Sequence, residues 1–389
     1  MATNDRGYLR FPAIHDEAMV FVCDDDLWRV PASGGLAYRL TAGLGEPATP
    51  AFSPDGKWLA YVSRDEVHPE VYLMAADGGP ARRMTWLGAN FLSVRGFTPD
   101  GHIIFTTPAG QPFFRNFRAY TLGLDDPLPE MLPLGQVDHL AYGPRSGTSQ
   151  AMLIGRNTRD PAWWKRYRGG TAGHLWIDAG GSGDYRRMGE LQGNITSPMW
   201  LGNRVYFLSD WQGIGNLYSC LPDGKDLRRH SDHAEYYARH ATTDGRRIVY
   251  QCGADLWLYD PASDQANRID IRVPAHRTQA ARKFVPAADY LGGVHVHPQG
   301  HSIALEARGK LFAGALWEGA MRQLGDATIG RQRHGQWLAD GTTLVAVSDA
   351  SGEERVVVHA GGAERTLGWN VGRVIALRAA PVGTLVALS

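Results

Sequence analysis

The residues best suited to chemistry lie at positions 155–171, where the chain reads GRNTRDPAWWKRYRGGT. This stretch mixes five cationic side chains with three aromatic ones. Guanidinium groups bind carboxylates through paired hydrogen bonds, and flat aromatic rings can form walls beside them. The loop therefore suits an acidic side chain or the C-terminus of a peptide. The candidates for lining a peptide channel are Arg156, Trp164, Lys165, Arg166 and Arg168.

A purely structural role is the alternative for the same stretch, because long loops are often but not always functional. In that case its arginines face water and its tryptophans cap the fold beneath them. Replacing Arg156, Arg166 and Arg168 together separates the two hypotheses, since a peptide path predicts a change in peptide affinity and a structural loop does not.

No other motif supports a catalytic or metal site. Residues 147–151 approach a Gly-x-Ser-x-Gly nucleophile elbow, but they lack the last glycine and the strand-turn-helix context. His295 and His297 would share one strand face without an evident third ligand. The acidic run 24–26 lacks the pattern of a calcium loop, and the polar loop 230–233 is expected to be solvated. We therefore predict no catalytic residue, no metal and no cofactor in this chain.

Composition narrows the class of partners. The 389 residues include 40 basic and 40 acidic side chains, so no net charge favours nucleic acid or an anionic membrane. Three cysteines argue for a reducing compartment and against a disulfide framework. Neither a signal peptide nor an apolar run of the ~18 residues needed to span a bilayer is visible. We expect a soluble, cytoplasmic protein.

The element that must position the loop is a repeated β-meander, most legible at residues 52–85. Its turn Pro54-Asp55-Gly56 uses proline to fix φ and glycine to accept a positive φ. Short runs rich in Val, Tyr and Trp between such turns indicate strands. The unit has about four strands in roughly 40 residues, which is the size of one propeller blade. An aliphatic residue beside an aromatic one recurs a strand later, from Leu27-Trp28 to Leu311-Phe312, and is expected to pack between blades.

Counting the units predicts the domain organisation. Copies begin near residues 16, 56, 101, 147, 202 and 245; residues 272–290 break the rhythm; and the repeat resumes near 300, 341 and 383. We predict an all-β chain with a six-bladed β-propeller at 1–271, a linker at 272–290 and the first two to three blades of a second propeller at 291–389. A closed propeller needs at least four blades, so we expect this sequence to be a fragment of a longer protein.

Several strings are more specific than these turns. They are Gly155-Arg156-Asn157-Thr158, residues 164–171, residues 223–228, and the run 236–248 with YYARH and TDGRRI. With the opening residues 12–15 and 21–28, they resemble the N-terminal propeller of the tricorn protease family. The similarity extends from about Tyr8 to about Phe284 and continues more weakly to the end.

The resemblance implies a six-bladed propeller followed by the start of a seven-bladed one. In that family the propellers gate passage of peptides to and from a serine-protease site on later domains. Subunits form a hexamer that cleaves oligopeptides released by the proteasome and passes the products to aminopeptidases. This chain would be the non-catalytic propeller portion. An alternative is a stand-alone protein- or peptide-binding propeller scaffold with no hydrolase partner domain.

One departure from the family concerns an adjacent arginine pair that holds the substrate C-terminus just before a Pro-Asp-Gly turn. This chain has Leu-Gly-Ala-Asn-Phe-Leu-Ser-Val at 87–94 instead, and Arg95 nearby cannot be equated with either member of the pair. The substrate preference of this chain therefore does not follow from the resemblance.

Overall fold

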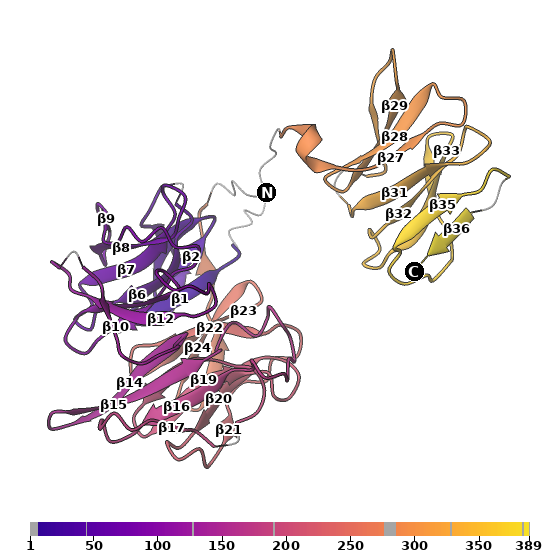
Figure 1. Cartoon of the computed structure of the whole chain (residues 1–389). Coiled ribbons are helices and arrows are strands. Elements are labelled where there is room, and N and C mark those ends of the chain that lie inside the picture. The colour runs from indigo at the N-terminus through magenta and orange to yellow at the C-terminus, as the bar shows by residue number, and fades with distance from the viewer. Residues whose placement is uncertain are drawn as a thin grey trace. The chain divides into compact units, whose positions relative to one another are not determined.

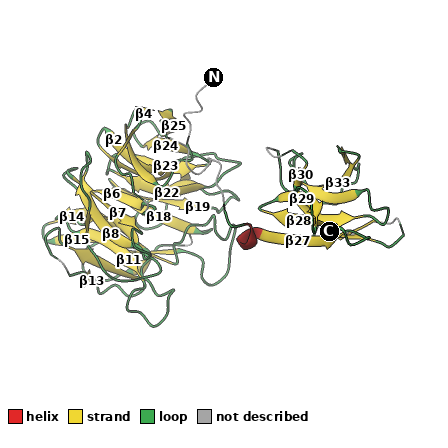
Figure 2. Ribbon diagram, turned by 90° about the horizontal axis from the view of Figure 1, so that it is seen from above, coloured by secondary structure: helices red, strands yellow, loops and turns green. Residues whose placement is uncertain are grey.

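The computed structural model describes residues 7–43, 45–126, 128–189, 191–275, 285–326, 329–382 and 385–388. These residues form an all-β protein in which strands dominate, with one short 3-10 helix, η1 (Ala287–Tyr290) (Figure 2). Within the described part of the chain, no helix is long and apolar enough to cross a membrane. The chain divides into two compact units, Met1–Ala281 and Arg282–Ser389.

Among its described residues, the first unit contains six four-stranded antiparallel sheets (Figure 1). Each is built from strands in chain order, as the predicted blades require, and only the first sheet passes over one strand, β4. Blade 1 is β1 (Arg10–His15), β2 (Ala18–Cys23), β3 (Asp26–Pro31) and β5 (Tyr38–Arg39). Blade 2 is β6 (Ala48–Phe52), β7 (Trp58–Ser63), β8 (Glu70–Ala75) and β9 (Arg82–Arg83). Blade 3 is β10 (Ser93–Phe97), β11 (Ile103–Thr107), β12 (Arg118–Leu122) and β13 (Glu130–Met131).

The next three blades repeat this order of strands. Blade 4 is β14 (His139–Ser146), β15 (Ser149–Arg156), β16 (His174–Asp178) and β17 (Arg186–Arg187). Blade 5 is β18 (Ile195–Leu201), β19 (Arg204–Ser209), β20 (Asn216–Cys220) and β21 (Arg228–Arg229). Blade 6 is β22 (Ala238–Thr243), β23 (Ile248–Cys252), β24 (Asp255–Asp260) and β25 (Gln265–Arg268). Each turn used to count the repeat joins the first two strands of a blade, so the predicted count of six is confirmed.

Six hydrophobic clusters hold the blades together, and each contains residues from two neighbouring blades. The recurrent pair on the third strand explains how. In blade 1, Leu27 packs toward blade 2 and Trp28 packs toward blade 6. In blade 5, Leu217 packs toward blade 6 and Tyr218 toward blade 4. Successive residues of a strand point to opposite faces of the sheet, so each pair serves two interfaces.

The ring closes between the first and last blades. Their shared cluster includes Trp28 and Val249 together with Ile271 and Val273. Next to it, β26 (Ile271–Arg272) pairs in parallel with β4 (Gly35–Leu36). These contacts continue past residue 271, into the segment 272–290 that the repeat count assigns to a linker. Residues 276–284 of that segment lie outside the described residues, and the division at 272–290 stays a prediction.

The second unit contains two further four-stranded sheets and a hairpin. The first sheet is β27 (Leu291–Val296), β28 (Ser302–Ala307), β29 (Lys310–Ala315) and β30 (Arg322–Leu324). The second is β31 (Gln332–Trp337), β32 (Leu344–Ser348), β33 (Arg355–Ala360) and β34 (Ala363–Thr366). The hairpin is β35 (Ala376–Ala379) with β36 (Leu385–Leu388). The described strands therefore match the predicted two to three blades.

The first strand of every blade in the first unit forms the inner rim of the ring. These strands lie at the edge of their sheets and contact the first strands of neighbouring blades. Each one shifts register against the second strand of its blade at a β-bulge. Four bulges place a residue other than glycine at positive φ: Phe11, Thr49, Ser197 and His240. A bulge re-aims side chains, so these residues are turned relative to a regular strand.

Candidate functional site

The segment that connects β15 to β16 reaches the inner rim of the ring. We call residues 157–168 the axis segment. The imidazole Nδ1 of His139, on the inner strand of blade 4, lies 2.9 Å from the hydroxyl of Thr158. The backbone carbonyl of Thr158 accepts a hydrogen bond from the hydroxyl of Thr196 on the inner strand of blade 5, at 2.8 Å. Thr158 is fully buried between these two strands.

The next two residues of the axis segment reach two more blades. The Arg159 guanidinium lies over the ring of Phe117 at 5.0 Å and donates to the Arg115 carbonyl of blade 3 at 3.3 Å. The Asp160 carboxylate accepts from Nε of Arg239, on the inner strand of blade 6, at 2.7 Å. Three consecutive residues therefore contact four of the six blades, which places them at the end of the propeller axis.

A set of cationic and imidazole side chains surrounds this point on the inner strands. Nη1 of Arg95 lies 2.7 Å from Nε2 of His139, and Nε of Arg95 donates to the Thr106 hydroxyl at 2.9 Å. Nε2 of His240 lies 3.6 Å from the Asp160 carboxylate. Among the described residues, no carboxylate oxygen lies within the 4.0 Å of an ion pair from the Arg95 guanidinium. Arg95 is therefore a cation whose direct partners are neutral.

These surroundings fix the protonation of both imidazoles. Burial, with Arg95 and His240 nearby, holds the pKa of His139 well below its usual value. Burial lowers the pKa of His240 to about 4, although Asp160 opposes the shift. Both rings are neutral at pH 7. Because a guanidinium can only donate, Nε2 of His139 is the acceptor, and its Nδ1–H donates to Thr158.

Buried Asp210 anchors two of the predicted channel residues on blade 5. Its carboxylate accepts from the backbone N–H of Arg166 at 2.7 Å and from Nη1 of Arg168 at 3.0 Å. It also accepts from the backbone N–H of Asn194 at 2.8 Å. Arg168 is thus held in an ion pair, while the side chain of Arg166 remains exposed.

Of the other three candidates, Lys165 and Trp164 lie close to Asp210 in the chain fold, and Arg156 lies apart from it. Lys165 sits over the ring of Tyr237 at 5.5 Å, and Trp164 stacks on Tyr167 at 4.9 Å while staying exposed. Arg156 lies over Trp176 of its own blade at 5.1 Å, and its buried Nε has no hydrogen-bond partner among the described residues. The structure brings Lys165, Arg166 and Arg168 together over blade 5 and leaves Arg156 apart from them.

Sequence reasoning missed the residues that meet at the axis. The composition of residues 155–171 emphasises the cations, whereas the side chain that bonds to the inner strand of blade 6 is the acidic Asp160. Its partner Arg239 is 79 positions away, in a string noted only for its family resemblance. The available signal was a lone acid within a basic loop, opposite an arginine-histidine pair on a first strand.

The loop 230–233 differs from its expected solvated state. Ser231 is buried, and His230 lies almost entirely within the protein. Nε2 of His230 is 2.6 Å from the Ser219 hydroxyl, and its Nδ1 is 2.6 Å from the Asp264 carboxylate. This row has the order of a Ser-His-Asp triad, but Ser219 is fully buried and takes a hydrogen bond from Nε of Arg204. The row ties blade 5 to blade 6 and offers no accessible nucleophile.

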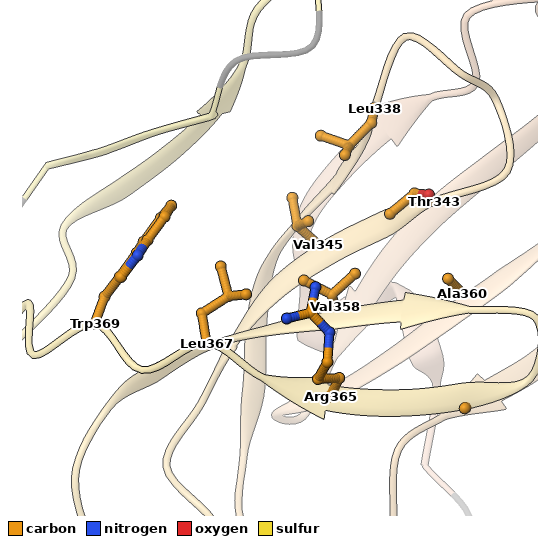
Figure 3. A pocket seen from close by; sticks show the side chains of 9 residues that line it. Leu338, Thr343, Val345, Val358, Ala360, Arg365, Leu367 and Trp369 are labelled. Atoms are coloured by element: carbon orange, nitrogen blue, oxygen red, sulfur yellow. The ribbon is translucent and has the colours of Figure 1, made fainter.

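Elsewhere the described residues offer little chemistry. No group of three or more His, Cys, Asp or Glu side chains in the described ranges could hold a metal ion. His295 and His297 each bond to the backbone of the neighbouring blade, through the Trp337 N–H and the Gly341 carbonyl. A cavity of about 560 Å³ in the second unit is lined by apolar side chains together with Thr343 and Arg365. Figure 3 shows these side chains. That lining contains neither a histidine nor a carboxylate.

Comparisons with known proteins agree with this architecture. The family model of the tricorn protease N-terminal beta propeller domain matches residues 6–265. The chain is 37% identical to putative tricorn protease homolog 2 of Streptomyces coelicolor, over 98% of this chain and 34% of that protein. It is 34% identical to a tricorn protease homolog of Saccharolobus solfataricus, over 99% and 35%. The crystal structure of the tricorn protease matches with a TM-score of 0.74 at 28% identity, over 96% of this chain and 36% of that one. The chain thus spans about a third of the length of these relatives.

Proposed function

Because this chain belongs to the tricorn protease family, we propose that it is the non-catalytic propeller portion of a serine protease that degrades oligopeptides. Its propeller would govern the passage of peptides along the axis and support assembly of the protease. The catalytic residues would lie on other parts of the protein.

The observation that carries this proposal is the position of the axis segment. Thr158, Arg159 and Asp160 contact blades 3 to 6 at the end of the axis, so a peptide travelling along the axis must meet them. Exposed Trp164, Lys165 and Arg166 extend the same segment outward and offer aromatic and cationic contacts. Peptides carry carboxylates, which such groups bind.

The finer parts of the proposal follow from the family alone. The assembled protein would be a cytoplasmic hexamer that takes oligopeptides downstream of the proteasome and supplies products to aminopeptidases. A stand-alone scaffold would instead capture a folded partner, and pull-down with peptide-coated and protein-coated beads separates these two functions.

The first test uses the isolated chain and fluorogenic peptides. We expect no cleavage at any pH, because no accessible serine, threonine or cysteine among the described residues is hydrogen-bonded to a histidine that could activate it. Turnover that persists through rigorous purification would contradict the proposal. Peptide binding should nevertheless be measurable by calorimetry.

The second test asks whether the predicted channel residues contact peptide. Replacing Arg156, Arg166 and Arg168 by Ala should weaken binding of short peptides by about a hundredfold, since each of the three lost charge-assisted contacts is worth on the order of 1 kcal/mol. The charge-matched control replaces exposed Arg186, Arg228 and Arg246, which lie on outer strands and turns. Equal affinity in the two triple variants, with equal melting temperatures, would leave the loop a structural element.

A further inference from the structure

The carboxylate of Asp160 occupies a position in the first unit that suits a ligand carboxylate. Its Oδ2 meets two nitrogens of Arg239, Nε at 2.7 Å and Nη2 at 2.5 Å, and lies 3.6 Å from Nε2 of His240. The ring of Phe11 packs on His240 with centroids 4.3 Å apart. An arginine fork beside an aromatic wall is a favourable receptor for a carboxylate.

The two acids that hold the axis segment differ in kind. Asp210 is fully buried and takes hydrogen bonds from two backbone N–H groups besides Arg168, which makes it a permanent anchor. Asp160 belongs to the segment itself, retains some solvent contact and takes its interblade hydrogen bond from Arg239. A peptide carboxylate could replace every interblade contact of Asp160, whereas no ligand carboxylate could reach the position of Asp210.

We propose that Arg239, with His240 and Phe11 beside it, is a binding site for a peptide carboxylate, and that Asp160 fills this site as an internal competitor when no peptide is bound. An arriving carboxylate displaces Asp160, and residues 157–162 move off the axis while Asp210 keeps the rest of the segment attached. The inference rests on the proposed passage of peptides. Arg239 and His240 lie on blade 6 and Phe11 lies on blade 1, whereas residues 87–94, where the family's arginine pair is missing, lead into the inner strand of blade 3.

The experiment compares the whole chain with its Asp160→Asn variant, and Asp77→Asn is the charge-matched control. Asp77 lies exposed in the turn after β8, far along the sequence from the site. The probes are a tetrapeptide with a free C-terminus, its C-terminal amide, and amides carrying either Glu or Gln at the second position. These arms separate a terminal carboxylate from a side-chain carboxylate.

Asp160→Asn should bind peptides that carry a carboxylate about tenfold more tightly than the wild type, because the internal competitor is lost. Affinity for the uncharged amide should not change. Amide hydrogen exchange in residues 157–162 should accelerate by about tenfold in the variant, since opening no longer breaks an ion pair. Asp77→Asn should match the wild type in both measurements. Arg239→Gln should abolish the preference for carboxylates with or without Asp160.

Unchanged exchange and unchanged affinity in Asp160→Asn, at an unchanged melting temperature, would overturn the inference. If Asp160→Asn does not fold, Asp160→Glu serves in its place, and a carboxylate preference equal to the wild type would count against the competitor role. Binding of acid and amide peptides with equal affinity in every variant removes the inference and leaves the proposed function standing. Absence of any peptide binding, in the wild type and in all variants, removes both.

Discussion

His240 illustrates how a place on the inner rim changes the chemistry of a side chain. Its burial holds the pKa near 4, far below the value of about 6.5 for a histidine in an unfolded chain. His139, on the inner strand of blade 4, is shifted in the same direction. In this range the unfolded chain binds more protons than the folded one. The stability that these neutral histidines contribute is therefore fully present above about pH 6.5, and the free energy of unfolding falls as the pH drops toward 4.

We expect unfolding in urea to show this loss between pH 7 and pH 5. His240 contributes a loss of about 1 to 2 kcal/mol over that interval, and His139 adds a loss in the same direction. His240→Gln should remove the contribution of His240 to this pH dependence, because a glutamine does not titrate. Exposed His68→Gln is the control and should leave the pH dependence unchanged. A wild-type stability that stays constant from pH 7 to pH 5 would contradict the assignment of neutral imidazoles.

At this scale the sequence indicated residue types but not their partners. The basic loop 155–171 was found because its composition is unusual, and its roles depend on Asp210 and Arg239, which no local pattern connects to it. Contacts between residues 40 to 80 positions apart arise from the closure of the ring. A local sequence pattern cannot pair these residues, because their proximity depends on how the blades are arranged around a common axis.

The blades show which features a repeat makes predictable. The turns of the Pro-Asp-Gly type fixed the strand count because each sits between the first two strands of a blade. A second regularity is a threonine or serine hydroxyl that accepts a hydrogen bond from the third strand of its blade. This hydroxyl lies 15 positions after a buried polar residue, as Thr41 does after Asp26 and Thr85 does after Glu70. Thr41 bonds to the N–H of Leu27, and Thr85 bonds to the N–H of Val71 at the same 2.9 Å. Ser231 repeats the bond to Leu217 at 2.9 Å, although its loop was expected to be solvated.

In blade 2, Gly56 of the Pro-Asp-Gly turn is needed for a second reason besides its positive φ. Gly56 and Gly101 occupy equivalent turns with φ of 71° and 91°. A Cβ on Gly56 would lie 2.6 Å from the ring of His15, whereas a Cβ on Gly101 would meet nothing within 4 Å. His15 uses that ring to reach the Pro54 carbonyl of the next blade at 3.1 Å. Gly56 therefore provides both a positive φ and room for an interblade hydrogen bond.

We expect Gly101→Ala to lower the free energy of unfolding by about 1 kcal/mol, the cost of a positive φ for alanine. Gly56→Ala should cost about 1 kcal/mol more, because His15 must also give up its hydrogen bond. Chemical denaturation of both variants measures the difference. In a His15→Ala background the two glycine substitutions should cost the same. A difference that survives in that background would show that His15 is not its cause.

At the scale of the whole molecule, the first unit depends on its closure. Ile271 is buried in the cluster shared by blades 1 and 6, and β26 adds its pairing with β4. Ile271→Ala should lower the free energy of unfolding of the first unit by about 2 to 4 kcal/mol, through lost burial and the resulting cavity. Ile375→Ala, at an exposed position of the second unit, is the control and should have almost no effect.

The measurement is denaturation followed by tryptophan fluorescence, with the same substitution made in a chain that ends at residue 275. If blades 1 and 6 close the ring, the shorter chain should unfold in one cooperative transition and lose the same stability on Ile271→Ala. An unaffected midpoint in both chains would mean that the closing contacts do not stabilise the ring.

The bulged inner strands have a consequence for the motion of a chain along the axis. A regular strand edge pairs readily with an extended peptide and holds it through a ladder of backbone hydrogen bonds. Each of the six inner edges is interrupted by a register shift, so none presents an unbroken ladder. An extended peptide would be surrounded by six strand edges, each of which could pair with it over only a few residues. If peptides pass along the axis as proposed, the inner rim would not hold them by backbone pairing, and side chains such as Arg239 would set where they bind.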